Sequence, residues 1–308
     1  MIAKDYRPHT SGIAFAIGEQ PIKSFLSLRS MVRLSIGEAL TNLLFGNITR
    51  YSDIHLVMSF NCAGKLEGET ARMYECCKEV KEATSELNLE IVNVKDSVSM
   101  AVHMEEETVK APLTLVVTAF ANTEDVNGLI TPDIKHAVLH SRILFIDLNV
   151  NKKCVLGGTA LAQVIDQIGE EASDVDLKLL QRSFYTIQNL IKQRHIISGH
   201  DRSDGGLITA LLEMCFAGNC GIDITLPEGV EPISYLFNES LGWLLEVDEL
   251  LCEPLLRTFR DHQIPAVVIG VTKEEQVIRV EFLLSTINPI GPTRRCGHSR
   301  RFDLELAK

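Results

Sequence analysis

The chain has 308 residues, of which 45% are hydrophobic and 23% are charged, as is usual for a soluble globular protein. Its 30 basic and 41 acidic residues give a formal net charge of −11, which disfavours binding to nucleic acid or to an anionic membrane surface. A ligand that carries phosphates would therefore need a metal ion or local helix dipoles to bind.

The first part of the chain alternates between helical and strand patterns. In chain order, the spacing of apolar residues predicts a helix over 29–45, a strand over 54–60, a helix over 70–87, a short strand over 91–94 and a strand over 113–120. Thr131-Pro132-Asp133 then breaks the pattern, and we place a domain boundary there. Residues 1–132 are thus predicted to form an N-terminal domain.

A second domain is predicted over residues 133–283. Its pattern indicates a strand over 143–148, helices that begin near 159 and 176, a helix from Leu207 onward, and strands over 222–225, 243–247, 266–270 and 277–282. Strands and helices mix without a strict β-α-β period, which favours an α+β fold over a doubly wound parallel sheet. Beyond Leu283 the pattern degrades, and residues 284–308 are predicted to form an irregular tail.

The most informative segment runs from His200 to Leu207. It places two carboxylates, a hydroxyl and two glycines directly before a predicted helix. Oxygens of Asp201 and Ser203 beside a helix N-terminus suit a divalent cation that carries phosphates. The alternative is an ordinary N-capped turn whose aspartates are solvated.

Two further positions carry oxygens or a cation that suit the same ligand. Glu38 and Asn42 lie four residues apart on the first predicted helix, so their oxygens share one face and could hold one side of a magnesium ion. Residues at this spacing also commonly face solvent. Lys95 follows a predicted buried strand, where it could neutralise a phosphate or form a structural ion pair.

A glycine pair, Gly157-Gly158, precedes another predicted helix. Such a turn can cradle a phosphate, although close packing of the helix on a sheet would explain the glycines as well.

The cellular location is predicted from the absence of membrane-span, signal-peptide and paired-cysteine patterns in the sequence. No apolar run approaches the ~20 residues of a membrane span, and residues 1–10 lack the apolar core of a signal peptide. The eight cysteines show no paired CxxC pattern, as is usual for free thiols in a cytoplasmic protein. A cytoplasmic location is therefore expected.

The order of several segments is more specific than any one of them. Together they resemble phosphoribosylformylglycinamidine synthase, the large formylglycinamide ribonucleotide amidotransferase of purine biosynthesis. The resemblance covers roughly Gly12 to Val280. The segments that carry it are Gly18 to Pro21, Gly37 to Asn42, Lys95 to Met100, Lys110 to Pro112, Leu156 to Gln163 and His200 to Ile222.

The resemblance implies a fold and a reaction. Members of the family are ligases that convert formylglycinamide ribonucleotide, ATP and glutamine to the amidine. They do so by phosphorylating the substrate amide oxygen before ammonia attacks the activated carbon. Their synthetase region has two pseudo-symmetric halves, each similar to aminoimidazole ribonucleotide synthetase. Each half pairs an α/β domain that contributes strands to a barrel with a second α/β domain, and this chain resembles the second half.

The resemblance also implies site residues. Glu38, Asn42 and Asp201 match magnesium ligands of an ATP or ADP site, and Ser203 matches a nucleotide contact. Whether that site serves chemistry or holds ADP as a structural element stays open at this point.

The chain departs from the family in ways that bear on its activity. It starts too late to contain a further magnesium aspartate, and it matches neither the first synthetase half nor the glutaminase domain. Those parts are the expected partners, and without them the isolated chain is expected to lack glutamine-dependent turnover. One alternative is a non-catalytic nucleotide-binding or interaction module derived from the enzyme. Another is a homodimeric synthetase of the same superfamily.

Overall fold

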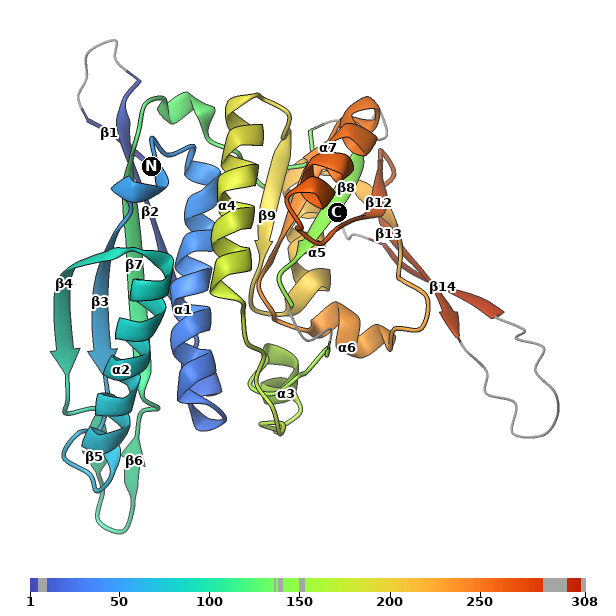
Figure 1. The fold of residues 1–308 in the computed structure, drawn as a ribbon. Helices are drawn as coiled ribbons and strands as arrows, with labels where there is room; N and C mark the ends of the chain where they lie inside the picture. Colours follow the sequence, from blue (N-terminus) through green and yellow to red (C-terminus); the bar gives the residue numbers. More distant parts are fainter. Residues whose placement is uncertain (5–9, 136, 138–140, 150–152, 285–297, 306–308) are drawn as a thin grey trace.

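The computed structural model describes residues 1–4, 10–135, 137, 141–149, 153–284 and 298–305. The first sheet has five strands in the order β1-β2-β7-β3-β4 (Figure 1). Its members are β1 (Ile2–Ala3), β2 (Gly12–Glu19), β3 (His55–Asn61), β4 (Glu90–Ser97) and β7 (Thr114–Thr123). Strands β3 and β4 pair in parallel and the other neighbours are antiparallel, so the sheet is mixed.

Two long helices and several short elements complete this part. The helices are α1 (Leu28–Leu43) and α2 (Glu69–Leu87), and β5 (Ala101–His103) pairs with β6 (Thr108–Lys110). Single 3-10 turns are η1 (Ile22–Phe25), η2 (Leu44–Gly46), η3 (Tyr51–Asp53) and η4 (Val126–Gly128).

The second sheet has seven strands in the order β14-β13-β10-β12-β8-β11-β9. These are β8 (Arg142–Asp147), β9 (Ser198–Arg202), β10 (Gly221–Thr225), β11 (Gly242–Val247), β12 (Ala266–Lys273), β13 (Val277–Leu284) and β14 (His298–Glu305). Among these described strands, β10 and β13 pair in parallel and the remaining pairs are antiparallel. The helices are α3 (Ala160–Val164), α4 (Leu177–Lys192), α5 (Gly206–Gly218), α6 (Pro232–Phe237) and α7 (Glu249–Asp261).

The central strands β8 and β11 of the second sheet are buried on both faces. Leu144 of β8 and Trp243 of β11 belong to a core that also contains the apolar residues of α1 and α4. Their neighbours Phe145 and Leu244 belong to a second core with α5 and α6. Because side chains alternate along a strand, a strand buried on both faces is apolar throughout, which explains the unbroken hydrophobic run in β8.

Helix α1 lies between the two sheets, beside α4 (Figure 1). The Ser27 side chain caps it by accepting a hydrogen bond from the backbone N–H of Ser30 at 3.1 Å. Most of its residues are buried, so α1 lacks the solvated face of an ordinary surface helix. Two glycines permit the close packing: a Cβ on Gly18 of β2 would lie 2.3 Å from the Ser35 carbonyl oxygen, and one on Gly37 would lie 2.2 Å from Leu241 Cδ1.

These features confirm two α/β domains with mixed sheets. Within the described residues neither sheet closes on itself, and the predicted contribution to a barrel stays a prediction, as does the boundary at residue 132. None of the helices in the described ranges is long and apolar enough to cross a membrane. The structure differs from the expected irregular tail at 298–305, where β14 pairs with β13 in antiparallel register. No apolar pattern in this segment predicted the strand.

The glycine contacts on α1 generate a stability prediction. Gly18→Ala should destabilise the fold by about 3 kcal/mol, because the new methyl group meets the backbone of α1, which cannot move aside. Gly37→Ala should cost no more than about 1 kcal/mol, because alanine favours the helix and the Leu241 side chain can rotate. Urea unfolding of both variants tests this, and an equal cost for the two would contradict it.

Candidate functional site

Glu38 is the centre of a polar site between the two domains. It lies in the second half of α1, and its Oε2 atom accepts hydrogen bonds from the Glu19 backbone N–H and from Gln20 Nε2, both at 2.9 Å. Glu19 is the last residue of β2, which packs along α1, and Gln20 follows it. The strand end therefore positions the carboxylate through two uncharged donor groups.

Negative charge is crowded around this carboxylate. Burial raises the pKa of Glu38 to about 7, the hydrogen bonds from Gln20 and Glu19 oppose this rise, and the charges of Asp204 and Asp201 add to it. Burial likewise raises the pKa of Asp204, with a further contribution from the charge of Glu239. A cation placed among these groups would relieve their mutual repulsion.

Asp201 reaches this region from β9 in the second domain. It pairs with Trp243 of β11, whose Nε1 donates to the Thr41 carbonyl oxygen of α1 at 3.1 Å. Asp201 Oδ1 lies 3.4 Å from His200 Nδ1, whereas Oδ2 is buried and accepts no hydrogen bond from any described residue. A buried carboxylate oxygen without a partner is costly, and a bound cation would supply the missing interaction.

A cavity of about 340 Å³ opens beside Glu38. Residues of the first domain line it from Ile17 to Lys23, and Gly158 and Asp204 line it from the second domain. Gly158 has a φ of +71°, and a Cβ there would lie 2.8 Å from Lys23 Cγ, so the turn tolerates glycine alone.

The structure brings some of the predicted site residues together. Glu38 and Gly158 line one cavity, and Asp201 is close enough to Glu38 for its charge to act there. Asn42 lies one turn further along α1, is exposed, and its Nδ2 is 3.4 Å from the Ile17 carbonyl oxygen. Ser203 is half-buried in the turn that leads to α5, where its carbonyl oxygen accepts from the Gly206 N–H. Their roles as ligands stay predictions.

Two other predicted positions lie elsewhere. Gly157 lines a separate, mostly apolar hollow, where a Cβ would lie 2.2 Å from the Glu171 carbonyl oxygen. The expectation that Lys95 follows a buried strand is wrong: Lys95 lies within β4, an exposed edge strand, and donates to Ser97. The short apolar run before it suggested burial, but no sixth strand covers this edge among the described residues.

Sequence reasoning missed Lys23 and Glu239, which are both almost completely buried beside this cavity. They form an ion pair with 2.9 Å between Lys23 Nζ and Glu239 Oε2. A lone charged residue in a mixed segment is usually exposed, so no local signal in either segment indicated burial.

The donor set fits a magnesium ion that is shared with a ligand. The described part of the chain holds no group of three or more His, Cys, Asp or Glu side chains that together form a ready-made metal cage. Magnesium usually takes one or two carboxylates and completes its shell with waters and phosphates, so Glu38, Asp201 and the amide of Asn42 suit it.

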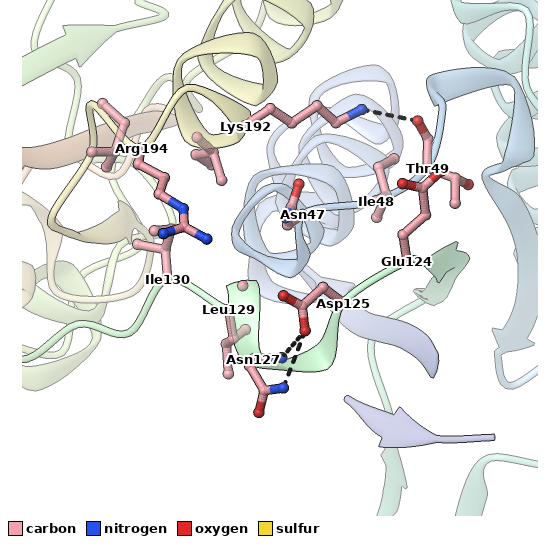
Figure 2. Close-up of a pocket in the computed structure, with 13 residues that line it drawn as sticks. Asn47, Ile48, Thr49, Glu124, Asp125, Asn127, Leu129, Ile130, Lys192 and Arg194 are labelled. Carbon is pink, nitrogen blue, oxygen red and sulfur yellow. Dashed lines mark hydrogen bonds between the residues drawn. The ribbon is translucent and has the colours of Figure 1, made fainter. Parts of the chain in front are cut away.

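A larger cavity of about 530 Å³ lies elsewhere, at the C-terminal ends of α1 and α4. Figure 2 shows Lys192 and Arg194 on one side and Asp125 with Asn127 on another. Asp125 Oδ1 accepts from both nitrogens of Asn127, at 2.9 and 3.2 Å. Among the described residues that line this cavity, none belongs to the predicted site.

Comparison with known proteins gives matches along most of the chain. A family model described as the FGAR-AT PurM_N-like domain matches residues 1–122, and one described as the AIR synthase related protein, C-terminal domain, matches residues 151–282. The chain is 39% identical over 301 residues to phosphoribosylformylglycinamidine synthase from Homo sapiens, covering 96% of this chain and 22% of that protein. The probable Arabidopsis thaliana enzyme is 40% identical over 283 residues, covering 91% and 20%.

Solved structures share the fold at low sequence identity. PurL from T. maritima complexed with FGAR gives a TM-score of 0.70 at 13% identity, covering 96% of this chain and 50% of that one. The hydrogenase maturation protein HypE from E. coli gives 0.62 at 14% identity, covering 96% and 87%. The chain thus spans about a fifth of the length of the curated relatives it matches.

The raised pKa of Glu38 generates a prediction on stability. Between its ordinary value of 4.5 and about 7 the folded state binds more protons than the unfolded state, so stability falls as the pH rises through this range. Without metal ions, the free energy of unfolding of the wild type should fall by about 2–3 kcal/mol between pH 4.5 and 8, and that of Glu38→Gln should not show this fall. Urea unfolding in EDTA at several pH values measures this, with the exposed Glu281→Gln as the control for charge removal. Parallel pH profiles for the wild type and Glu38→Gln would contradict it.

Proposed function

We infer the function of this chain from its family: it belongs to the phosphoribosylformylglycinamidine synthases, as a stretch homologous to their synthetase region. We propose that it supplies a magnesium–nucleotide site to the ligase reaction that converts formylglycinamide ribonucleotide to the amidine in purine biosynthesis. The chain corresponds to about a fifth of the length of its relatives. The glutamine-dependent reaction is therefore proposed for this chain only together with the other synthetase half and the glutaminase domain. A cytoplasmic location is part of this proposal.

One observation carries the proposal. Two domains meet at a cavity where the carboxylates of Glu38 and Asp204 are crowded. Asp201 does not line this cavity, but its charge acts on Glu38, and its buried Oδ2 atom has no hydrogen bond among the described residues. A divalent cation that bridges to phosphates would relieve both features. Solved structures of T. maritima PurL are complexes with ATP and with ADP, which supports a nucleotide as the ligand.

Each candidate residue has a proposed role. Glu38, Asn42 and Asp201 would hold the cation, and Ser203 and the Gly158 turn would contact the nucleotide. The cation would supply charge neutralisation for phosphates that the acidic chain otherwise repels. Lys95 has the least support, because it lies on the exposed edge strand and does not line the cavity.

The exposed outer face of the first sheet is evidence for a protein partner. Ile13, Phe15 and Ile17 alternate along β2 on the face away from α1 and are 39%, 50% and 55% exposed. Exposed apolar side chains in a row indicate a surface that another protein covers. We propose a further synthetase-like domain as that partner, in line with the barrel that the resemblance implies.

The second candidate function is a nucleotide-binding or interaction module without catalysis. HypE shares this fold but is a hydrogenase maturation protein, so the fold alone does not determine the chemistry. Under this alternative the nucleotide would bind and would stabilise the protein, but the site would take no part in turnover.

The proposal predicts magnesium-dependent ADP binding. Isothermal titration of the chain with ADP should give binding in the presence of Mg²⁺ and none in EDTA. Asp201→Asn should weaken binding at least about tenfold, because it removes the charge and keeps the shape of the side chain. Asp125→Asn in the larger cavity is the matched control and should bind like the wild type. Equal loss in both variants, or no binding by the wild type, would refute the assignment.

A further inference from the structure

We propose that Lys23 and Glu239 are positioning residues, which act through Gln20 to orient the Glu38 carboxylate. This inference rests on the function proposed above for the same site. Its structural basis is a chain of hydrogen bonds that runs from the second domain to Glu38.

Glu239 begins this chain and is fixed in place by three donors. Its Oε1 atom accepts from the backbone N–H groups of Ala160 and Gly205, both at 2.8 Å, and its Oε2 accepts from Lys23 Nζ at 2.9 Å. The side chain is 1% exposed. One carboxylate therefore joins the first residue of α3, the turn before α5 and η1 of the first domain.

Lys23 is the next member, and its chemistry sets the direction of the chain. Its side chain is 2% exposed, and Nζ donates to Gln20 Oε1 as well as to Glu239. An ammonium group has donors and no acceptor, so the oxygen of the Gln20 amide must face it. The NH₂ group of that amide is then directed away from Lys23.

This orientation places the Gln20 NH₂ group on Glu38. Gln20 is 6% exposed, and its Nε2 donates to Glu38 Oε2 at 2.9 Å. The Glu19 N–H donates to the same Glu38 oxygen, and no described residue donates to Glu38 Oε1. Without Lys23 the amide could rotate and place its oxygen against the carboxylate, which would turn Glu38 away from its present orientation.

Lys23 and Glu239 thus affect the cation without touching it. Groups that orient a metal ligand in this way typically change metal affinity by about 10–100-fold when they are removed. The ligand class is the one already proposed, a divalent cation with a nucleoside diphosphate.

The test compares Lys23→Met with the wild type in titrations with Mg²⁺ and ADP. We expect the variant to bind Mg²⁺-ADP about 10–100-fold more weakly. In a Glu38→Gln background, Lys23→Met should cause no further loss, because the orientation of Glu38 no longer matters. A merely structural role would give additive losses in this cycle.

Two further variants keep the test decisive where Lys23→Met folds poorly. Lys23→Met/Glu239→Gln removes both buried charges together, and Gln20→Leu breaks the chain while leaving the ion pair intact. Both should show the same loss of affinity, with thermal unfolding confirming that they are folded. Arg33→Met is the matched control: Arg33 is also a buried cation, it pairs with Asp174 at 2.9 Å, and it lies outside the chain to Glu38.

Each outcome decides between the claims. Wild-type affinity in Lys23→Met, in the double variant or in Gln20→Leu overturns the positioning role, as do losses that add to that of Glu38→Gln. An equal loss in Arg33→Met also overturns it, because general loosening of the domain contact would then explain the effect. Absence of Mg²⁺-ADP binding by the wild type instead overturns the proposed function itself.

Discussion

The burial of α1 between two sheets is the constraint on which the rest of the structure depends. A helix that is covered on opposite sides must present apolar residues almost all round, and its neighbours must approach closely. The polar residues that α1 does bury are hydrogen-bonded, as Ser35 is to the Met31 carbonyl oxygen. Glu38 lies where α1 borders the cavity, which puts a carboxylate from the first domain close to the acidic turn of the second.

The Lys23–Glu239 ion pair is better explained by specificity than by stability. Removing two charges from water costs several kcal/mol for each ion, and the attraction between them only partly offsets this cost. Both charges have further hydrogen bonds: Glu239 accepts from two backbone N–H groups, and Lys23 also donates to Gln20. Such a pair accepts one relative placement of the two domains, since any shift would leave a buried charge unsatisfied.

Sequence patterns predicted those features whose signals are local. The buried run of β8 and the acidic turn before α5 each lie within a few residues, so periodicity and turn chemistry indicate them. Family resemblance added the pairing of Glu38 with Asp201, which no local pattern contains. Lys23 and Glu239 lie 216 residues apart, and their contact depends on the packing of both domains. For the same reason the exposure of Lys95 was missed, because burial of a strand depends on which neighbour covers it.

The acidic character of the chain and the arrangement of the site are linked. Several carboxylates meet at one cavity, and Lys23, a buried cation that lines it, is already engaged by Glu239. The pKa of Asp204 therefore stays raised although the charge of Lys23 lowers it, and burial raises the pKa of Glu38 to about 7. A site that was purely structural would gain stability by replacing one of these carboxylates with an amide. Retaining them is understandable if a divalent cation enters with its ligand, because only then do the same charges become favourable.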